Sequence, residues 1–534
     1  MRYDVIIIGA GHNGLTAAAY LARGGRRVLV LERRAIVGGC AVTEEVDPER
    51  APGCRVSTAS YIASMLRPTI IRDLDLARHG LKMVACEPGV QAAFAEDGGD
   101  VVAWWSDRQR MTAELERMAP NDVERFFETQ SELLRLAAWL QPFFLERPPD
   151  LHAAGFDRLR EGIRLWRRFR GIGGGDIAGL LRFLSGSLGE FLDARFESEK
   201  LKRLILANSL YGKHGGPYQP GTAMGLLFHL LSGGDADQQA WQGHVIGGMG
   251  AITQALRSAC EELGVEIRTE ASVGRINVAS GKACGVTLDN GENLDASLVV
   301  SNADPKRTFL QLVDASDLDE SFRRDVQNIR MDGPAGKVNF VLSEEPVVRG
   351  MPADRSREQR SLFTLIPTLD EAEDNYNAAR KGRIPDRLWV DCVLASNVDD
   401  TLAPAGRHML TCFVQYLPYT FESGDWDDER ESLGDRVTAL IGEFAPNVPE
   451  SIVARAVFAP PDLERRFGIT EGNIFHGDIS LEQMFFMRPL PDWSQYRTPV
   501  DGLFLCGAGT HPGGGVTGAP GYNCAQQILR TTRA

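Results

Sequence analysis

Apolar runs and helical spacing alternate over the first thirty residues of the chain. Residues 3–8 form a largely apolar run, as expected for a parallel strand that is buried on both faces. Residues 15–22 have helical spacing, and residues 27–31 form a second strand-like run. The order strand, helix, strand predicts a βαβ unit within an α/β domain.

Two later segments repeat this mixture of strands and helices. The pattern predicts a helix to about Leu263, a strand over 265–269, a hairpin turning at 289–291, a strand over 502–506 and a helix from about Tyr522. Between these segments, residues 84–242 are mostly helical by periodicity. Residues 306–469 contain four strand-like runs: 337–343, 362–366, 388–395 and 409–417.

Composition and charge exclude several classes of function. The formal net charge of −14 disfavours a nucleic-acid partner, because phosphate backbones select basic surfaces. The nine cysteines are scattered without a CxxC pair, and neither they nor the nine histidines have metal-ligand spacing, so we expect reduced thiols and no metal. No targeting segment follows Met1 and no window of eighteen apolar residues occurs, which predicts a cytoplasmic protein.

A glycine motif stands between the first strand and the first helix. Gly9 permits the tight turn, Gly11 lets the backbone approach a pyrophosphate, and Gly14 allows the helix to pack closely on the strand. The second strand delivers Glu32, whose carboxylate can accept from ribose hydroxyls. The motif therefore predicts a dinucleotide site. Its candidate contacts are Gly9, Ala10, Gly11, Asn13, Gly14 and Glu32.

Gly38 and Gly39 form a second glycine element shortly after the acidic residue. This arrangement resembles the two-dinucleotide-binding-domain flavoproteins, whose Gly-Gly element passes the diphosphate of FAD. The resemblance implies that Arg34 reaches towards the ribose or phosphate, and Arg33, Gly38 and Gly39 are further candidate contacts of the cofactor. The alternative for Arg34 is a solvated cation at a helix start.

A glycine-rich loop over 507–521 follows the last predicted strand. Its glycines permit backbone contact with a flat ring, and the helix after it can stabilise negative charge near flavin N1 and O2. Gly507, Val516 and Thr517 are the candidates for the flavin end. His511 either faces the ring or caps the loop.

These motifs together resemble the phytoene-desaturase-like flavoproteins. The likeness covers nearly the whole chain and is strongest to the pyridine nucleotide-disulfide oxidoreductase domain-containing protein 2 family, with the carotenoid-ketolase branch next. In the amine-oxidase and carotenoid-desaturase flavoproteins, a valine like Val273 offers its backbone to the adenine; an ordinary strand residue is the alternative. Ser301, at the end of the strand that follows the hairpin, is a further candidate contact.

The resemblance implies a discontinuous fold of two interleaved domains. Residues 1–83, 243–305 and 470–534 are expected to form a Rossmann-like FAD-binding domain. Residues 84–242 and 306–469 are expected to form an α+β substrate domain, in which helices cover a mixed sheet. The cofactor expected is FAD.

Lys337 is the candidate catalytic residue. In flavin amine oxidases, a lysine in a similar strand holds a water near flavin N5, and Lys337 looks like its counterpart; an exposed lysine at a strand start is the alternative. Amine oxidases tend to carry a tyrosine at the position of Val516, so the aliphatic residue here favours an apolar substrate.

The leading hypothesis is an FAD-dependent oxidoreductase that takes hydride from an apolar, lipid- or isoprenoid-like molecule at flavin N5. No second nucleotide fingerprint and no CxxxxC pair after Gly39 occur, so oxygen or a quinone is expected as acceptor rather than NAD(P). A redox-neutral isomerase that uses reduced FAD and a non-catalytic, FAD-stabilised interaction protein are the alternatives.

One segment of the chain has the pattern of a helix that could contact a membrane. Residues 158–170 hold six arginines and one acid, with apolar residues at helical spacing. Such a basic amphipathic helix can lie in a membrane interface and admit a lipid, or it can pack on its own domain.

Overall fold

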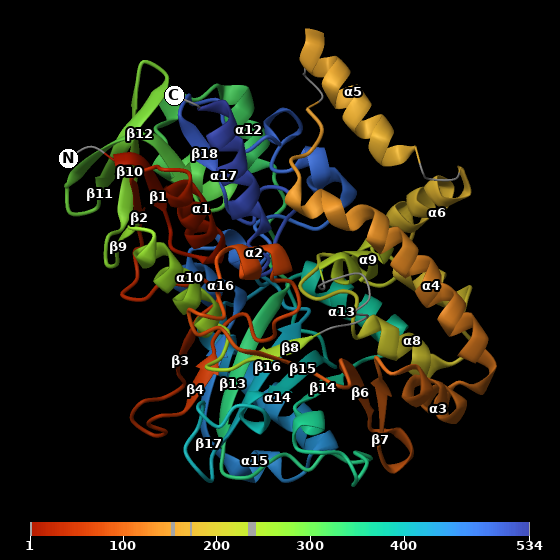
Figure 1. The fold of residues 1–534 in the computed structure, drawn as a ribbon. Coiled ribbons are helices and arrows are strands. Elements are labelled where there is room, and N and C mark those ends of the chain that lie inside the picture. The colour runs from red at the N-terminus through yellow and green to blue at the C-terminus, as the bar shows by residue number, and fades with distance from the viewer. Residues whose placement is uncertain (1–2, 151–154, 171–173, 233–241, 533–534) are drawn as a thin grey trace.

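Two large β-sheets organise the chain (Figure 1). The computed structural model describes residues 3–150, 155–170, 174–232 and 242–532. The first sheet has the strand order β10-β11-β12-β1-β2-β9, with β18 paired to β12. Its strands are β1 (Tyr3–Ile8), β2 (Val28–Leu31), β9 (Glu266–Arg268), β10 (Val273–Ala279), β11 (Lys282–Leu288), β12 (Asn293–Ser301) and β18 (Leu503–Leu505).

The centre of this sheet is parallel. β1 pairs in parallel with both β2 and β12, and β18 pairs in parallel with β12. The carboxyl ends of these strands therefore meet at one edge, where ligands of α/β sheets bind. The hairpin β10–β11 and the pairing of β11 with β12 are antiparallel.

Helices cover both faces of the first sheet. On one face α1 (His12–Arg23), α10 (Gly250–Glu262) and α17 (Ala519–Thr531) pack through a shared core with alternate side chains of β1 and β2. α1 presents the small residues Ala17, Ala18 and Ala19 to this core, which lets the three helices approach closely. α12 (Glu320–Gln327) packs on the opposite face.

The second sheet is mixed and has the order β17-β13-β16-β15-β14-β6-β7. Only β14 and β6 pair in parallel. Its strands are β6 (Val90–Phe94), β7 (Asp100–Trp104), β13 (Ala335–Leu342), β14 (Leu362–Leu365), β15 (Trp389–Leu394), β16 (His408–Gln415) and β17 (Ile452–Phe458). α14 (Trp426–Phe444) packs on one face through Leu433, Val437 and Ile441.

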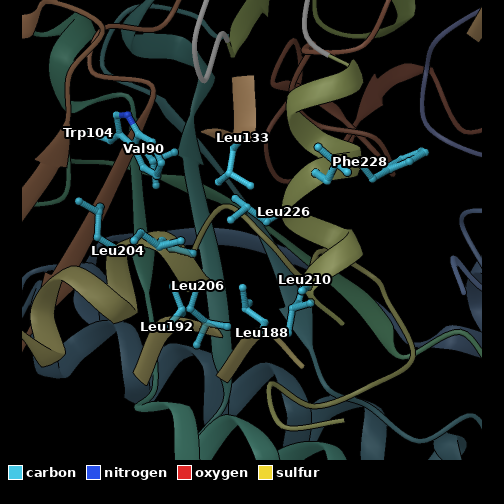
Figure 2. Packing of buried hydrophobic residues seen from close by; sticks show 14 of the residues in the cluster. Val90, Trp104, Leu133, Leu188, Leu192, Leu204, Leu206, Leu210, Leu226 and Phe228 are labelled. Carbon is cyan, nitrogen blue, oxygen red and sulfur yellow. The ribbon is translucent and has the colours of Figure 1, made fainter. Parts of the chain in front are cut away.

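A helical layer covers the other face of the second sheet (Figure 2). Its helices are α3 (Arg108–Met118), α4 (Val123–Leu140), α6 (Gly174–Ser185), α7 (Leu188–Asp193), α8 (Glu199–Leu206), α9 (Ala223–Ser232) and α13 (Leu369–Arg380). Leu204 and Leu226 belong there to the same apolar core as Val90 and Trp104 of the sheet. The shorter elements are α2 (Pro68–Asp73), α11 (Pro305–Arg307), α15 (Val448–Ser451), α16 (Pro460–Phe467), β3 (Thr43–Glu45), β4 (Arg55–Ser57), β5 (Met83–Ala85) and β8 (Gly243–Val245).

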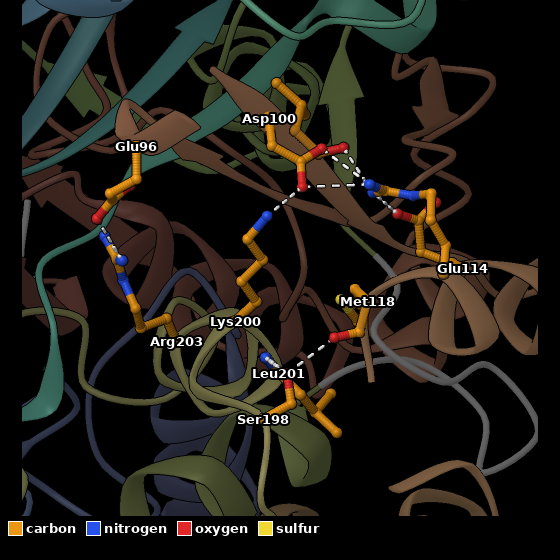
Figure 3. A network of polar contacts seen from close by, with 10 residues as sticks. Glu96, Asp100, Glu114, Met118, Ser198, Lys200, Leu201 and Arg203 are labelled. Carbon is orange, nitrogen blue, oxygen red and sulfur yellow. Dashed lines mark hydrogen bonds and ion pairs between the residues drawn. The ribbon is translucent and has the colours of Figure 1, made fainter. Parts of the chain in front are cut away.

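Ion pairs hold this helical layer to the edge of the sheet (Figure 3). The carboxylate of Asp100, on β7, accepts from Lys200 Nζ at 2.6 Å and from Arg117 Nη1 at 2.9 Å. Arg203 donates to Glu96 Oε1 at 2.9 Å. Ser198 caps α8 by accepting from Leu201 N. The helices α3 and α8 are thereby fixed to β7.

The sheet-and-helix fold class predicted from the sequence is confirmed, but some elements differ. The second sheet has seven strands rather than four, because β6 and β7 lie in the segment expected to be mostly helical and β17 was not predicted. α17 begins at Ala519 rather than near Tyr522. The domain boundaries given above stay a prediction. Within the part of the chain that the structure describes, no helix is long and apolar enough to cross a membrane.

The buried leucines of the helical layer generate a stability prediction. Leu204 is fully buried, so Leu204→Ala is expected to lower the free energy of unfolding by about 2–5 kcal/mol through lost burial and a cavity. Leu181→Ala on α6 is the matched control, because that side chain is 62% exposed and its loss should cost less than about 0.5 kcal/mol. Calorimetry should show a lower Tm for the first variant only; equal Tm values would contradict the packing described.

Candidate functional site

A cavity is lined by residues from both large sheets. At one end lie the turn between β1 and α1 and the end of β2. At the other end lie side chains of β13, β15 and β16, among them Lys337, Asp391 and Phe413. The site therefore joins the parallel sheet to the mixed sheet.

The turn after β1 is built for close backbone approach. Gly9 has a φ of +92° and donates from its N–H to Leu31 O. A Cβ at Gly14 would lie 2.2 Å from Gly9 O, so only glycine lets α1 start so near the strand. Gly9, Gly11 and Asn13 line the cavity, whereas Gly14 lies behind them. The amino end of α1 thus opens onto the cavity and offers free N–H donors there.

Glu32 is held by two backbone donors. Its Oε2 accepts from Ala10 N at 2.9 Å and its Oε1 accepts from Arg34 N at 3.0 Å. The side chain is buried and lines the cavity. Ala10 is absent from the cavity wall, and its part is to orient the carboxylate.

The two arginines after Glu32 also line the cavity. Arg34 pairs with Glu44 Oε1 at 2.5 Å, and its guanidinium lies 5.3 Å from the centroid of the Phe467 ring. Its side chain is half-buried, so the interpretation of Arg34 as a solvated cation is wrong. Arg33 donates to the carbonyl oxygens of Arg465 and Arg466, the latter at 2.6 Å.

The second glycine element folds back onto the first. Gly38 N donates to Ala10 O at 2.9 Å, and Gly38 has a φ of +132°. A Cβ at Gly39 would stand 3.3 Å from Gly11 Cα. The two glycine elements therefore make a wall of bare backbone along the cavity.

The remaining candidates from the sequence divide into two groups. Val273 and Val516 line the cavity. Ser301, Gly507 and Thr517 are absent from the cavity wall and support it. Ser301 Oγ contacts Thr308 Oγ1 at 2.8 Å, Thr517 Oγ1 accepts from Ala519 N, and a Cβ at Gly507 would lie 2.6 Å from Asn302 O.

His511 does not face the cavity. Its Nε2 lies 2.8 Å from Phe143 O, and the ring is buried among residues behind the glycine-rich loop. Burial lowers its pKa to about 4, so the ring is neutral near pH 7. Of the two interpretations offered for it, the structure supports a role in holding the loop.

A row of opposed side chains crosses the mixed sheet. In the register of β14, β15, β16 and β13, Thr364 pairs with Asp391, Asp391 with Phe413, and Phe413 with Lys337. Directly opposed residues share one face of a sheet, so the four side chains lie side by side. We call these four residues the cross-strand row.

Tyr61 lies over the cross-strand row. Its hydroxyl donates to Asp391 Oδ2 at 2.7 Å, and its ring stacks on Phe413 with centroids 5.5 Å apart. Lys337 Nζ lies 4.1 Å from the centroid of the same ring. One tyrosine from the segment before α2 thus contacts three members of the row.

Burial perturbs both ionisable members of the row. Lys337 is 1% exposed, and burial lowers its pKa to about 7. The alternative interpretation of Lys337 as an exposed strand-start lysine is therefore wrong. Asp391 is 2% exposed. Burial raises its pKa to about 6, although the hydrogen bonds from Thr364 and Tyr61 act to lower it.

The sequence alone missed several residues of the cavity. Asp391 had a visible signal, since it is an acid inside the apolar strand-like run 388–395, where an unpaired charge is costly. Tyr61 gave no signal of its own. Other residues of the wall that were not predicted are His12, Ser272, Asn302, Arg307, Ile474, Phe475, His476 and Gly515.

Comparisons with known proteins bear on the family. Residues 14–529 match the flavin-containing amine oxidoreductases. The chain is 35% identical to the pyridine nucleotide-disulfide oxidoreductase domain-containing protein 2 of Mus musculus, over 99% of this chain and 94% of that protein. It is 26% identical to one subunit of the limonene dehydrogenase of Castellaniella defragrans (99% and 94% covered) and 24% identical to phytoene desaturase of Fusarium fujikuroi (99% and 90% covered).

A solved structure gives the same fold. An oxidoreductase from Methanosarcina mazei superposes with a TM-score of 0.58 at 16% identity, over 99% of this chain and 100% of that chain. The resemblance predicted from the sequence is confirmed by the relative at 35% identity, and the phytoene desaturase is a more distant relative.

The nucleotide end of the cavity fits the cofactor of this family. Asn13 Oδ1 and Arg34 Nη1 are buried without a hydrogen-bond partner among the residues that the structure describes. Bare backbone at Gly11 and Gly39 can approach a diphosphate, and Glu32 stands where a ribose is expected. A flavin bound by a dinucleotide cradle is FAD. The chain belongs to the flavin-containing amine oxidoreductase family, and its cofactor is FAD.

Proposed function

We propose that the protein is an FAD-dependent oxidoreductase that dehydrogenates a largely apolar, lipid- or isoprenoid-like substrate. The observation that carries this proposal is the wall of the cavity between the glycine elements and the cross-strand row. That part of the wall is mostly aliphatic and aromatic: Met65, Leu230, Ile474, Phe475 and Val516. Such a wall gains binding free energy from apolar surface and gives an ammonium group no counter-charge.

The names of two relatives support an apolar substrate, since limonene and phytoene are both hydrocarbons. When bound, FAD supplies the acceptor for a hydride, at flavin N5. The residues of the chain hold the substrate against the apolar wall and exclude water. Lys337 brings a buried amine to the same cavity, and we propose it as the catalytic residue.

The cofactor contacts proposed are those that line the cavity or orient its wall. They are Gly9, Ala10, Gly11, Asn13, Gly14, Glu32, Arg33, Arg34, Gly38, Gly39, Val273, Ser301, Gly507, Val516 and Thr517. Oxygen or a quinone is proposed as the final electron acceptor. The redox-neutral isomerase remains the second candidate, because the same apolar wall would serve it.

Anaerobic mixing tests the reaction. The purified holoprotein is mixed with limonene, with a longer polyene such as phytoene, and with putrescine as an amine. Loss of the flavin absorbance with a hydrocarbon, together with a product lighter by two hydrogens, is the expected result. Reduction by putrescine alone would overturn the apolar substrate, and a product of unchanged mass would favour the isomerase.

The position of Glu32 predicts its effect on FAD affinity. Glu32→Gln removes the carboxylate that is placed to accept from the ribose and weakens the acceptor for Ala10 N and Arg34 N. A hydrogen bond to a charged group contributes about 1.5–3 kcal/mol, so the Kd for FAD should rise about tenfold to a hundredfold. Glu49→Gln, at an exposed position, is the control. Fluorescence titration of the apoproteins measures both; equal Kd values would remove Glu32 from the site.

The buried amine of Lys337 generates a kinetic prediction. Lys337→Met keeps the chain length but removes the amine, and it should slow flavin reduction or reoxidation about tenfold or more. Lys282→Met, at the exposed first residue of β11, should leave both rates unchanged. Stopped-flow absorbance resolves the two half-reactions. Wild-type rates in both would exclude Lys337 from the mechanism.

We also propose that α5 (Gly155–Phe169) contacts an anionic membrane surface. Leu159, Ile163 and Trp166 lie at helical spacing and are 58%, 41% and 62% exposed, so they are not packed into the protein. Arg158, Arg160 and Arg167 are exposed on the same helix. α5 extends from the edge of the molecule in Figure 1. The side chains of Arg168 and Phe169 lie outside the described residues.

Vesicle sedimentation tests this surface. Changing Arg158, Arg160 and Arg167 to glutamate should lower binding to phosphatidylglycerol vesicles about a hundredfold, because each basic residue near such a surface contributes about 1 kcal/mol. The matched control changes Arg50, Arg125 and Arg383, which are exposed elsewhere, to glutamate. Equal sedimentation of both triple variants would contradict a role for α5.

A further inference from the structure

The far end of the cavity is polar, although the middle of its wall is apolar. Lys337, Asp391 and Tyr61 line it, and three uncharged groups join them: Asn208, Tyr211 and Gln242. Asn208 and Gln242 are buried, and Gln242 Nε2 donates to Asn208 Oδ1 at 3.3 Å. A hydrocarbon would leave this end of the cavity without a matching ligand group, which costs free energy for every polar atom that it desolvates.

Lys337 is the group whose hydrogen bonds are incomplete. The carboxylate of Asp391 accepts from Tyr61 and Thr364, so both of its oxygens are satisfied. Lys337 Nζ is buried and has no hydrogen-bond partner among the described residues. Its contact with the Tyr61 ring is a cation–π contact, which leaves its N–H donors unused. Buried N–H donors are normally hydrogen-bonded, so we expect this amine to donate to an acceptor atom of a ligand in the cavity.

The charge of the acceptor follows from the groups around it. Asp391 and Lys337 carry opposite charges when they are ionised, and Phe413 lies between them in the cross-strand row. Their charges cancel when both are ionised, and the pair has no net charge when both are neutral. The other groups at this end, Tyr61, Tyr211, Asn208 and Gln242, are uncharged. A carboxylate or ammonium on the ligand would therefore be buried without a net counter-charge, which costs more than burying a neutral oxygen.

We propose that this end of the cavity is a subsite for a neutral hydroxyl or carbonyl oxygen, which accepts a hydrogen bond from Lys337 Nζ. The preferred substrate is then an otherwise apolar alcohol or ketone, which binds more tightly than the hydrocarbon of the same skeleton, and neither a fatty acid nor an amine. This inference rests on the proposed function for the apolar part of the substrate. It assigns to Asp391 and Tyr61 the role of positioning residues: Tyr61 holds the amine over its ring, and Asp391 holds Tyr61.

Three chain-matched probes test the subsite: octan-2-one, octanoate and octylamine. Each is titrated into the FAD-loaded protein at about pH 6.5, between the two pKa values of the pair, and Kd is read from the change in flavin absorbance or by calorimetry. Octan-2-one is expected to bind about tenfold or more tighter than either charged probe. Tighter binding of octanoate or of octylamine would overturn the proposal, as would equal binding of all three.

Variants of Lys337 test whether its amine causes the preference for the ketone. Lys337→Met should lower the affinity for octan-2-one about tenfold, the loss of one hydrogen bond to a charged donor, and Lys337→Gln should restore part of it because an N–H donor returns. Met65→Ala, in the apolar wall, should weaken all three probes by the same factor. A ketone affinity that is unchanged in Lys337→Met would overturn the subsite.

The binding test of the subsite and the flavin-reduction test of the proposed function can fail independently of each other. Octan-2-one has no carbinol hydrogen to lose, so its binding is measured without reduction of the flavin. Failure of the ketone preference, with hydrocarbons still reducing the flavin, would overturn the subsite alone. Selective ketone binding without reduction by any apolar donor would overturn the oxidoreductase proposal and leave the subsite standing.

Discussion

The close contact between α1 and the end of β1 is the constraint on which the cofactor site depends. A side chain at Gly14 would meet the carbonyl oxygen of Gly9 at 2.2 Å, so the helix can begin here only because no side chain is present. That position brings the N–H groups of the first helical turn to the cavity and places Ala10 N against Glu32. The parallel pairing of β1 with β2 and β12 then gathers Glu32 and Asn302 at the same edge. The cradle is thus a consequence of strand geometry and one missing Cβ.

The mixed sheet contributes to the site by a different principle. Its strands approach from distant parts of the chain, and their register alone decides which side chains share a face. Asp391, Phe413 and Lys337 become neighbours because three antiparallel strands place them directly opposite one another. The buried charges are tolerated because the tyrosine from the other half of the fold covers them and donates to the carboxylate.

This contrast explains what the sequence could predict. The contacts of Gly9, Gly14 and Glu32 form within about thirty residues, and their spacing is set by one strand and one helix, so a local pattern was sufficient. Tyr61 and Asp391 are 330 residues apart, and no local pattern carries their hydrogen bond. The strands β6 and β7 were missed for a related reason: they are short, and the hairpin that they form joins the sheet through the pairing of β6 with β14, which is far away in the chain. Ser301, Gly507 and Thr517 were predicted as cofactor contacts; they are absent from the cavity wall and lie next to it, and their contact with the cofactor stays a prediction.

The Tyr61–Asp391 hydrogen bond is one of several contacts between the segment after Gly39 and the mixed sheet, which also share the apolar cluster of Val56, Val341 and Met409. Tyr61 belongs to the segment that continues from Gly39 and Cys40 along the cavity, and Asp391 to the mixed sheet. A ligand that shifts Tyr61 from one end therefore also shifts the ring and hydroxyl that Lys337 and Asp391 contact at the other. By thermodynamic reciprocity, any change in cofactor affinity that a molecule at the row causes is matched by an equal change that the cofactor causes in the affinity for that molecule. Tyr61 is thus a side chain that the two ends of one cavity share.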